Sequence, residues 1–404
     1  MKNVVVLGMG YVGVPLLLAL VKSKKRVFGY DIKSSLIDLL NQGECHLNLW
    51  QERFSKEITP GENTFFVSNL KSIGKIDIAI ICVPTPLNIN GDPDHSFVET
   101  AVQSLSELDI EPSLIILEST VAPGYTRAIA EKCFSSRLSI HEGSVHFCFS
   151  PEREDPGNKN YSNVEIPKIL SGLSAKCLNL GAELYMSVFN HVIKASSLEA
   201  AELCKLHENT FRAVNISYAN QMRNYSTHLG VNFDEVISLA KSKPFGFMAF
   251  NSGIGVGGHC IPVDPHFLLS EAHKSGIEMP IVEKAMMEIE NGPRKTFDWL
   301  VKKGILGKDV LLTGIAYKDG VSDIRCSPAI ELFILLKKKC NVHFWDNKVS
   351  QIEIDGNAFI SVSDDFFKGF HGVVIVINDT GKRFVDDSKL SASLVLDPRY
   401  RITL

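Results

Sequence analysis

The chain has 404 residues, of which 45% are hydrophobic and 22% charged, and its formal net charge is −4 at pH 7. This composition is ordinary for a globular protein, and the length corresponds to about two to three domains. The sequence contains no basic run and no apolar segment approaching the ~20 residues needed to cross a bilayer, so we expect neither nucleic acid nor a membrane as a partner.

Nine cysteines are scattered along the chain, and no two of them have CxxC spacing. An odd number without that spacing disfavours a disulfide framework and a structural zinc site, and it fits a reducing, cytoplasmic location. We therefore expect no bound metal. Most of these cysteines are predicted to be small buried side chains, as Cys82 in "IAIICVP" illustrates. Cys260 differs because its neighbours are glycines.

Residues 1–31 predict a strand, a glycine turn, a helix and a second strand, in the segments "NVVVLG", "MGYVGVPLLLALVKSK" and "RVFGYD". Later apolar runs flanked by turn residues continue this alternation, in "IDIAIICVPTP", "SLIILESTVAPG", "VHFCFSPE" and "KILSG". Strands that alternate with helices indicate a parallel sheet with helices on both faces.

The turn after the first strand has the pattern GxGxxG, in "GMGYVG". Glycines at these positions allow a tight turn, a close approach of the backbone to a pyrophosphate and close packing of helix on strand. An acidic residue ends the second strand, where it hydrogen-bonds the ribose and repels a 2′-phosphate, which favours NAD over NADP. The alternative is a glycine turn needed only for packing. The residues assigned to the cofactor are Gly8, Gly10, Tyr11, Val12, Gly13 and Asp31.

Two threonines follow later strands of the same predicted sheet: Thr85 in "VPTP" and Thr120 in "ESTVAPG". Ligands of such folds bind at the carboxyl edge of the sheet, so we expect both threonines near the cofactor. A purely structural turn is the alternative for each of them.

Residues 197–229 contain neither glycine nor proline and predict one long helix, which Ser196 can cap. At 1.5 Å per residue this helix would span about 50 Å, longer than a small domain. It is therefore predicted to join two domains and to offer a dimer surface. Lys205 and Asn209 lie four residues apart on one face of it, where an ammonium and an amide suit a developing oxyanion. A solvated helix stripe is the alternative.

The stretch "NSGIGVGGHCIPVD" places glycines before Cys260 and Asp264 four residues after it. A thiol becomes a nucleophile when it is deprotonated and accessible, and glycines let a loop fold tightly around an extended ligand. A structural cysteine is the alternative. Glu152 in "FSPERED" follows a strand and is a candidate general base, with a surface salt bridge as the alternative.

From about residue 305 the alternation of strand and helix restarts, in "KDVLLTGIAY", "SPAIELFILLKKK", "NVHFWD", "GVVIVIN" and "SLVLDP". A strand again runs into glycine, and a second strand ends in Asp346, as in the N-terminal half. The sequence therefore predicts an α/β fold of two Rossmann-like, doubly wound domains joined by a long central helix.

Seven segments together resemble the nucleotide-sugar 6-dehydrogenases, the family that contains UDP-glucose dehydrogenase, from residue 3 to about 401. They are "GMGYVGVP", "ICVPTPL", "ESTVAPGYTR", "SPEREDPGN", "SSLEAAELCKLHENTFRAVNI", "GIGVGGHCIPVDPHFL" and "GIAYKDGVSDIRCSP". "SPEREDPGN" and "GGHCIPVDP" look like the branch that acts on UDP-N-acetylhexosamines, above all UDP-N-acetyl-D-glucosamine. The segment "ECHLNLWQERFSKEI" is less like the family than the rest.

The resemblance implies a cytoplasmic homodimer in polysaccharide biosynthesis that oxidises C6 of the sugar from alcohol to carboxylate with two NAD⁺. It divides the chain into an NAD-binding domain at 1–195, a central helical and dimerisation region with the cysteine loop at 196–295, and a UDP-sugar-binding domain at 296–404. UDP-N-acetyl-mannosamine, UDP-N-acetyl-galactosamine and UDP-glucose are alternative substrates.

By resemblance, Cys260 is the nucleophile that carries a thiohemiacetal and then a thioester, and Lys205 with Asn209 stabilises their oxyanions. Asp264 and Thr120 position water, and Glu152 assists thioester hydrolysis. Thr85, Thr120 and Arg325 join the cofactor site. The residues assigned to the substrate are Glu152, Arg153, Lys205, Asn209, Gly253, Gly255, Gly257, Lys318 and Arg399.

Two other functions remain open at this point. One is a two-electron dehydrogenase on a similar scaffold, such as an enzyme that oxidises a 3-hydroxyacid, in which Cys260 would be structural. The other is a non-catalytic, NAD-responsive binding protein, which would bind NAD without turning over any nucleotide sugar.

Overall fold

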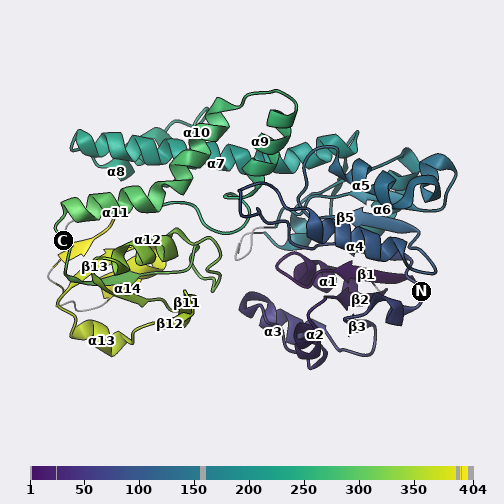
Figure 1. The fold of residues 1–404 in the computed structure, drawn as a ribbon, viewed down its shortest axis with the longest axis horizontal. Helices are drawn as coiled ribbons and strands as arrows, with labels where there is room; N and C mark the ends of the chain where they lie inside the picture. The colour runs from purple at the N-terminus through teal and green to yellow at the C-terminus, as the bar shows by residue number, and fades with distance from the viewer. Residues whose placement is uncertain (1, 24, 155–160, 388–391, 393, 399–404) are drawn as a thin grey trace. The chain divides into compact units, whose positions relative to one another are not determined.

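The computed structural model describes residues 2–23, 25–154, 161–387, 392 and 394–398 (Figure 1). The chain divides into two compact units. Unit 1 comprises Met1–Glu208 with His266–Gly276, and unit 2 comprises Asn209–Pro265 with Ile277–Leu404. Each unit is described by itself below.

Unit 1 is built on an eight-stranded sheet with the order β3-β2-β1-β4-β5-β6-β7-β8. From β3 to β6 all neighbours run parallel, whereas β7 runs antiparallel to β6 and β8 runs parallel to β7. The strands are β1 (Asn3–Leu7), β2 (Arg26–Tyr30), β3 (Thr64–Val67), β4 (Ile78–Ile81), β5 (Leu114–Leu117), β6 (His146–Phe149), β7 (Lys168–Gly172) and β8 (Val192–Lys194).

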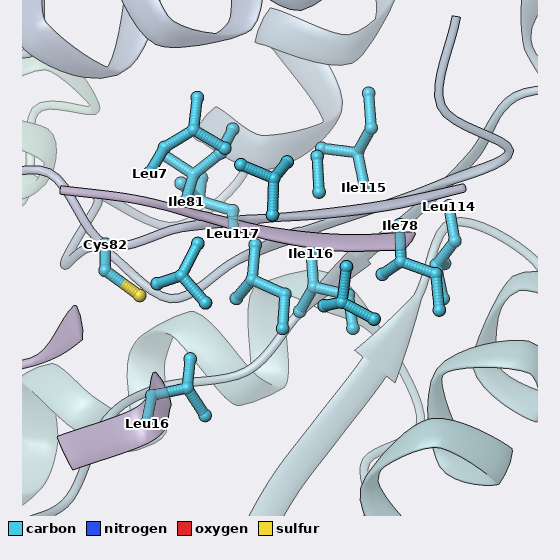
Figure 2. Packing of buried hydrophobic residues seen from close by; sticks show 14 of the residues in the cluster. Leu7, Leu16, Ile78, Ile81, Cys82, Leu114, Ile115, Ile116 and Leu117 are labelled. Atoms are coloured by element: carbon cyan, nitrogen blue, oxygen red, sulfur yellow. The ribbon is translucent and has the colours of Figure 1, made fainter. Parts of the chain in front are cut away.

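The core of unit 1 lies around the central strands, which are buried along their whole length, as expected where helices cover both faces of a sheet. The register places Leu7 of β1 beside Ile81 of β4, and Ile81 beside Leu117 of β5 (Figure 2). Leu16 of the first helix belongs to the same buried cluster. The helices are α1 (Gly13–Val21), α2 (Ser34–Asn41), α3 (Asn48–Glu57), α4 (Ser96–Ser106), α5 (Tyr125–Phe134) and α6 (Ala175–Met186).

The atypical segment after Gly43 forms α3, which packs against α1. Its Phe54 is fully buried, and the ring lies 5.7 Å from the ring of Phe66 in β3. The segment therefore extends the hydrophobic core at the β3 edge of the sheet.

The long helix predicted from the sequence is α7 (Leu198–His228), 31 residues that run from unit 1 into unit 2. Its first turn is capped by Ser197, whose hydroxyl accepts from the amide of Ala200 at 3.1 Å. The prediction of Ser196 as the cap was wrong by one residue, because the helix begins at Leu198. Within the described residues, no helix has both the length and the apolar character needed to span a membrane.

Unit 2 contains a four-stranded parallel sheet with the order β10-β9-β13-β14, and a separate hairpin of β11 and β12. The strands are β9 (Asp309–Thr313), β10 (Asn341–Trp345), β11 (Gln351–Ile354), β12 (Asn357–Ile360), β13 (Val373–Val376) and β14 (Leu394–Leu396). The helices that lie wholly in this unit are α8 (Phe233–Lys241), α10 (Pro280–Glu290), α11 (Gly292–Lys302), α12 (Pro328–Lys337), α13 (Asp364–Lys368) and α14 (Asp379–Asp387).

The two units repeat one local structure where the first strand of each sheet ends. In unit 1 the amide of Met9 donates to Asp31 at 3.0 Å, and in unit 2 the amide of Ile315 donates to Asp346 at 2.8 Å. In both units the acceptor follows the strand next to the glycine turn. The predicted fold class, with two Rossmann-like sheets and a long central helix, is confirmed.

Candidate active site

The glycine loop of unit 1 has two glycines that packing requires and one that it does not. A β-carbon on Gly13 would lie 1.8 Å from the carbonyl oxygen of Gly8, and one on Gly8 would lie 2.7 Å from that of Cys82. A β-carbon on Gly10 would meet nothing within 4 Å. Gly10 therefore leaves open space beside the N-terminus of α1, where a pyrophosphate fits the helix dipole and the free main-chain donors.

Asp31 is fixed by the backbone on both sides of it. One of its oxygens accepts from Met9 at 3.0 Å and the other from Lys33 at 3.0 Å. The carboxylate thus stands at the end of β2 beside the glycine loop, which is the position of a ribose-binding acid in dinucleotide folds. The residues of this loop fit NAD.

Thr85 and Thr120 follow the adjacent strands β4 and β5, so they lie at the same carboxyl edge of the sheet. Both are half-exposed. The hydroxyl of Ser119 donates to the carbonyl oxygen of Val83 at 2.7 Å and ties the two loops together.

The predicted Glu152 belongs to a buried cluster of charged side chains at this edge, whose other members were not predicted from the sequence. Lys168 Nζ donates to Glu118 Oε2 at 2.9 Å and to Glu152 Oε2 at 2.7 Å. Glu118 also accepts from the hydroxyl of Tyr185 on α6. We call Glu118, Lys168 and Glu152 the buried triad. The only sequence signals were a lysine at the start of "KILSG" and a glutamate at the start of "EST".

The pKa values of the two carboxyl groups in the buried triad are shifted in opposite directions. Burial raises the pKa of Glu118 to about 7, although the charge of Lys168 acts against it. Burial also acts to raise the pKa of Glu152, but Lys168 and two main-chain amides outweigh it and hold that pKa below its ordinary value. Those amides, of Arg153 and Glu154, both donate to Glu152 Oε1 at 2.7 Å.

Two predicted site residues of unit 1 are joined to this region. Lys205 Nζ donates to the carbonyl oxygen of Glu152 at 2.7 Å. The guanidinium of Arg153 donates to both oxygens of Glu208, at 2.6 and 3.1 Å, and to the carbonyl oxygen of Pro167 at 2.9 Å. Arg153 therefore clamps the chain just before β7, and its contact with substrate stays a prediction.

In unit 2, Asp264 is the first residue of α9 (Asp264–Lys274). Asn209 Nδ2 on α7 donates to Asp264 Oδ2 at 2.5 Å, and both side chains are buried. The amide of Asp264 donates to the carbonyl oxygen of Cys260 at 2.8 Å, which closes a turn between the cysteine and the helix. A buried amide–carboxylate pair thus stands one turn of chain from the thiol.

Cys260 is exposed, and its sulfur lies 3.4 Å from Nδ1 of His259. The glycines before it allow close packing: a β-carbon on Gly255 would lie 2.8 Å from Pro328, and one on Gly257 would lie 2.4 Å from Tyr317. The loop is thereby held against Tyr317 and the first residue of α12, Pro328, with the thiol left accessible.

Gly253, at the start of this loop, is hydrogen-bonded to two side chains of α7. Its amide donates to Asn220 Oδ1 at 2.8 Å, and Arg223 Nη1 donates to its carbonyl oxygen at 3.0 Å. Both main-chain groups of Gly253 thus have partners on the helix, and its contact with substrate stays a prediction.

The expectation that most cysteines are buried was too broad. Four are fully buried, three are partly buried, and Cys260 and Cys326 are exposed. Of the buried four, Cys148 lies in β6 and Cys177 in α6, Cys82 directly follows β4, and Cys45 lies in the loop between α2 and α3. Both exposed thiols stand in loops of unit 2. All nine are thiols rather than disulfides.

The remaining predicted residues lie in the second half of unit 2. Arg325 donates to both oxygens of Asp323, with Nη2 2.6 Å from Oδ2, and its carbonyl oxygen accepts from Gly258 at 2.9 Å. Lys318 is half-exposed and follows Tyr317, which packs on the cysteine loop. Arg399 lies outside the described residues.

Family comparison covers most of the chain. The UDP-glucose/GDP-mannose dehydrogenase family matches residues 2–189 with its NAD binding domain, residues 199–290 with its central domain and residues 311–402 with its UDP binding domain. The predicted cofactor, NAD, is confirmed by the first of these matches.

Individual proteins agree with this match. The UDP-N-acetyl-D-mannosamine dehydrogenase of Pyrococcus horikoshii is 34% identical over 343 residues, which cover 83% of this chain and 81% of that protein. The NDP-N-acetyl-D-galactosaminuronic acid dehydrogenase of Ralstonia nicotianae is 27% identical, over 98% of this chain and 96% of that protein. The solved structure of UDP-D-ManNAc dehydrogenase from Pyrococcus horikoshii has a TM-score of 0.85 and 29% identity, and covers 99% of this chain and 96% of that chain.

The predicted resemblance is thus confirmed in all three segments of the chain. The protein belongs to the UDP-glucose/GDP-mannose dehydrogenase family and is an NAD-dependent oxidoreductase.

Proposed function

We propose that this enzyme oxidises C6 of a UDP-N-acetylhexosamine from alcohol to carboxylate, in two successive oxidations with a covalent intermediate on Cys260. The observation that carries the proposal is the accessible thiol of Cys260, one turn of chain from the buried pair of Asn209 and Asp264. A two-electron alcohol dehydrogenase has no use for a nucleophilic thiol, whereas an enzyme that must retain an aldehyde for a second oxidation does.

The proposed sequence of bonds follows from that thiol. When bound, NAD⁺ accepts the hydride lost in each of the two oxidations. After the first oxidation the Cys260 thiolate adds to C6 of the aldehyde and forms a thiohemiacetal, which retains one hydrogen on C6. The second oxidation converts this adduct into a thioester. Water then cleaves the C–S bond, which releases the carboxylate and returns the thiol.

We assign the other roles by the chemistry of each side chain. Lys205 and Asn209 offer an ammonium and an amide to the oxyanions of the adducts. Asp264 and Thr120 position water, and Glu152, an ionised carboxylate beside Lys168, accepts a proton from the water that attacks the thioester. Arg325 remains our candidate for the cofactor pyrophosphate, although in this structure its guanidinium is paired with Asp323.

UDP-N-acetyl-D-glucosamine is our first candidate substrate, on the resemblance of "SPEREDPGN" and "GGHCIPVDP" to that branch. UDP-N-acetyl-D-mannosamine is the second, because relatives from Pyrococcus horikoshii and Escherichia coli that are 34% and 30% identical are N-acetylmannosamine dehydrogenases by name. A panel of UDP-N-acetylhexosamines and UDP-glucose, assayed for NADH release, separates these candidates.

We also propose that the enzyme works as a cytoplasmic homodimer with cofactor, central and UDP-sugar domains at 1–195, 196–295 and 296–404. Phe211, Tyr218 and Tyr225 on α7 are exposed by 44%, 60% and 58%, and their seven-residue spacing places them on one side of the helix. In a dimer, a second copy of the chain would remove these three aromatic side chains from water. A monomer in sedimentation equilibrium at micromolar concentration would contradict the dimer.

The test of the function is stoichiometry. We expect two NADH per molecule of sugar, an acyl adduct on Cys260 in mass spectra of enzyme quenched during turnover, and no acid from the Cys260→Ala variant, which still binds NAD. Cys326→Ser removes the other exposed thiol and is the matched control, with the wild-type yield expected.

The other two hypotheses predict different yields. One NADH per substrate, with a stable carbonyl product and full activity in Cys260→Ala, would replace this proposal by two-electron chemistry. Binding of NAD without turnover of any nucleotide sugar would indicate a non-catalytic protein.

A further inference from the structure

The buried triad carries an inference that rests on the proposed function and deepens it. We propose that Lys168 and Glu118 are positioning residues for Glu152: Lys168 keeps Glu152 ionised as the base of thioester hydrolysis, and Glu118 holds the one proton that the buried triad takes up.

The direction of the strands brings the three side chains together. Strands β5 and β6 run parallel, so Glu118 and Glu152, which follow them, lie at one edge of the sheet. Because β7 runs antiparallel to β6, its first residue, Lys168, lies at that same edge. Exposure of the side chains increases along the chain of contacts, from 0% at Glu118 and 4% at Lys168 to 12% at Glu152. The buried triad therefore runs from the fully buried Glu118 to Glu152, the most exposed of its three side chains.

The charges in the buried triad do not balance when every group is ionised. Two carboxylates and one ammonium leave one negative charge in a place that is largely shut off from water. Such a charge is costly, so one carboxyl group binds a proton instead. Lys168 remains the cation, because the two carboxyl groups raise its pKa despite burial.

The hydrogen bonds decide which carboxyl group holds the proton. Glu152 accepts two main-chain N–H bonds in addition to that of Lys168, and donors of this kind favour the charged form. Glu118 accepts from two side chains, Lys168 and Tyr185, and is wholly buried. The proton therefore belongs on Glu118.

Other titratable groups face the buried triad from the elements around it. Cys82 after β4 and Tyr185 on α6 lie near Glu118, and burial raises the pKa of both above their ordinary values. Glu154 lies beyond Glu152 and accepts from Asn163 at 3.0 Å. Burial and the charge of Glu152 raise the pKa of Glu154 to about 8. A test of Glu118 must therefore separate its titration from that of Glu154.

The kinetic test follows the hydrolysis step alone. Acyl-enzyme on Cys260 is formed in a single turnover with the UDP-N-acetylhexosamine that the wild type oxidises. Its decay is then followed by quenching and mass spectrometry after transfer to buffers from pH 4 to pH 9, because the pKa of Glu152 in the wild type lies below its ordinary value of 4.5. Without the charge of Lys168, the pKa of Glu152 should rise. We therefore expect the rise of the decay rate with pH to occur at least about one pH unit higher in Lys168→Met than in the wild type, so that decay is about tenfold slower at a given pH on the rising part of the profile. Lys168→Arg keeps the cation and should retain the wild-type profile.

The spectroscopic test needs no substrate. Infrared difference spectra of the wild type, titrated from pH 5 to pH 9, should lose a protonated carboxyl band with a midpoint near 7, and Glu118→Gln should lack that band. Glu154→Gln is the matched control, since it removes the neighbouring carboxyl and should leave the band in place.

The outcomes distinguish this inference from the function on which it rests. An unchanged pH profile in Lys168→Met, or a wild-type band in Glu118→Gln, would overturn the roles of Lys168 and Glu118. A wild type that never forms acyl-enzyme would overturn the proposed function, and the infrared titration would still decide where the proton lies.

Discussion

At the scale of single residues, different glycines of the loop after β1 serve folding and cofactor binding. Gly13 is required by its neighbours, because any side chain would overlap the carbonyl group of Gly8, whereas Gly10 faces open space. The GxGxxG pattern alone cannot tell these two requirements apart, since both are met by the same residue type. The structure assigns packing to one glycine and leaves the other for the cofactor.

This difference predicts opposite phenotypes for two identical substitutions. Gly10→Ala should fold with a wild-type melting temperature and lose NAD affinity, because its methyl group occupies the space for the pyrophosphate. Gly13→Ala should lower the free energy of unfolding by about 1–3 kcal/mol, the usual effect of overpacking. Calorimetry and NAD titration measure the two effects, and a destabilised Gly10→Ala variant with normal NAD affinity would contradict the assignment.

At the scale of secondary-structure elements, α7 holds α5 by a buried side chain. Glu202 of α7 is fully buried, and its carboxylate accepts from the amides of Gly124 at 2.6 Å and Thr126 at 2.9 Å. These amides stand at the N-terminus of α5, where main-chain donors lack partners within the helix. One glutamate thus caps a helix that is distant in sequence.

We expect Glu202→Ala to lower the free energy of unfolding by about 1–3 kcal/mol for each amide left unpaired. Glu202→Gln, which keeps one oxygen acceptor, should lose less. Urea unfolding followed by the fluorescence of Trp50 in unit 1 measures both variants. Equal stability of Glu202→Ala and the wild type would show that water replaces the cap.

The elements themselves were largely predictable from the sequence, and their pairing was not. Apolar runs bounded by turn residues gave the central strands and the second sheet, and the absence of glycine and proline gave α7. The hairpin of β11 and β12 was missed, although Asp355–Gly356 is a typical hairpin turn with positive φ at both residues. Its strands are short, and only one of them carries a clear apolar alternation.

The residues of the candidate site were also predictable only in part. The thiol, the acid after it and the lysine–asparagine pair on α7 were recognised because each stands in a distinctive segment. Lys168 was missed because it stands in no motif with a chemical meaning of its own, and Glu118 because only Thr120 of the segment "ESTVAPGYTR" was assigned to the site. Their pairing depends on the reversed direction of β7, which the residues of "KILSG" do not encode.

At the scale of the whole molecule, buried carboxyl groups make stability depend on pH. The pKa values of Glu118 and Glu154 rise from the ordinary value of 4.5 to about 7 and about 8. Both groups bind a proton more tightly in the folded chain than in the unfolded chain. Their contribution to stability is therefore complete below pH 4.5 and is lost as the pH rises through about 7 and about 8.

We expect the unfolding transition of unit 1 to move to lower temperature as the pH is raised from 5 to 9, at constant ionic strength. The double variant Glu118→Gln/Glu154→Gln should flatten this dependence, because neither amide titrates. Differential scanning calorimetry across that range measures both proteins. A double variant whose melting temperature falls as steeply as that of the wild type would place the titration elsewhere.

The reversal of β7 has a consequence for recombination between relatives. A strand in the opposite direction would deliver its first residue to the far rim of the sheet, about 15 Å away for a strand of this length. A chimera therefore keeps the ion pairs of the buried triad only if residues 118 to 168 all come from one parent, or if both parents carry the same three residues. If the parents differ at one of the three positions, we expect a crossover between residues 118 and 168 to leave a buried charge without its partner and to destabilise the chimera. A crossover outside that range should leave these ion pairs intact.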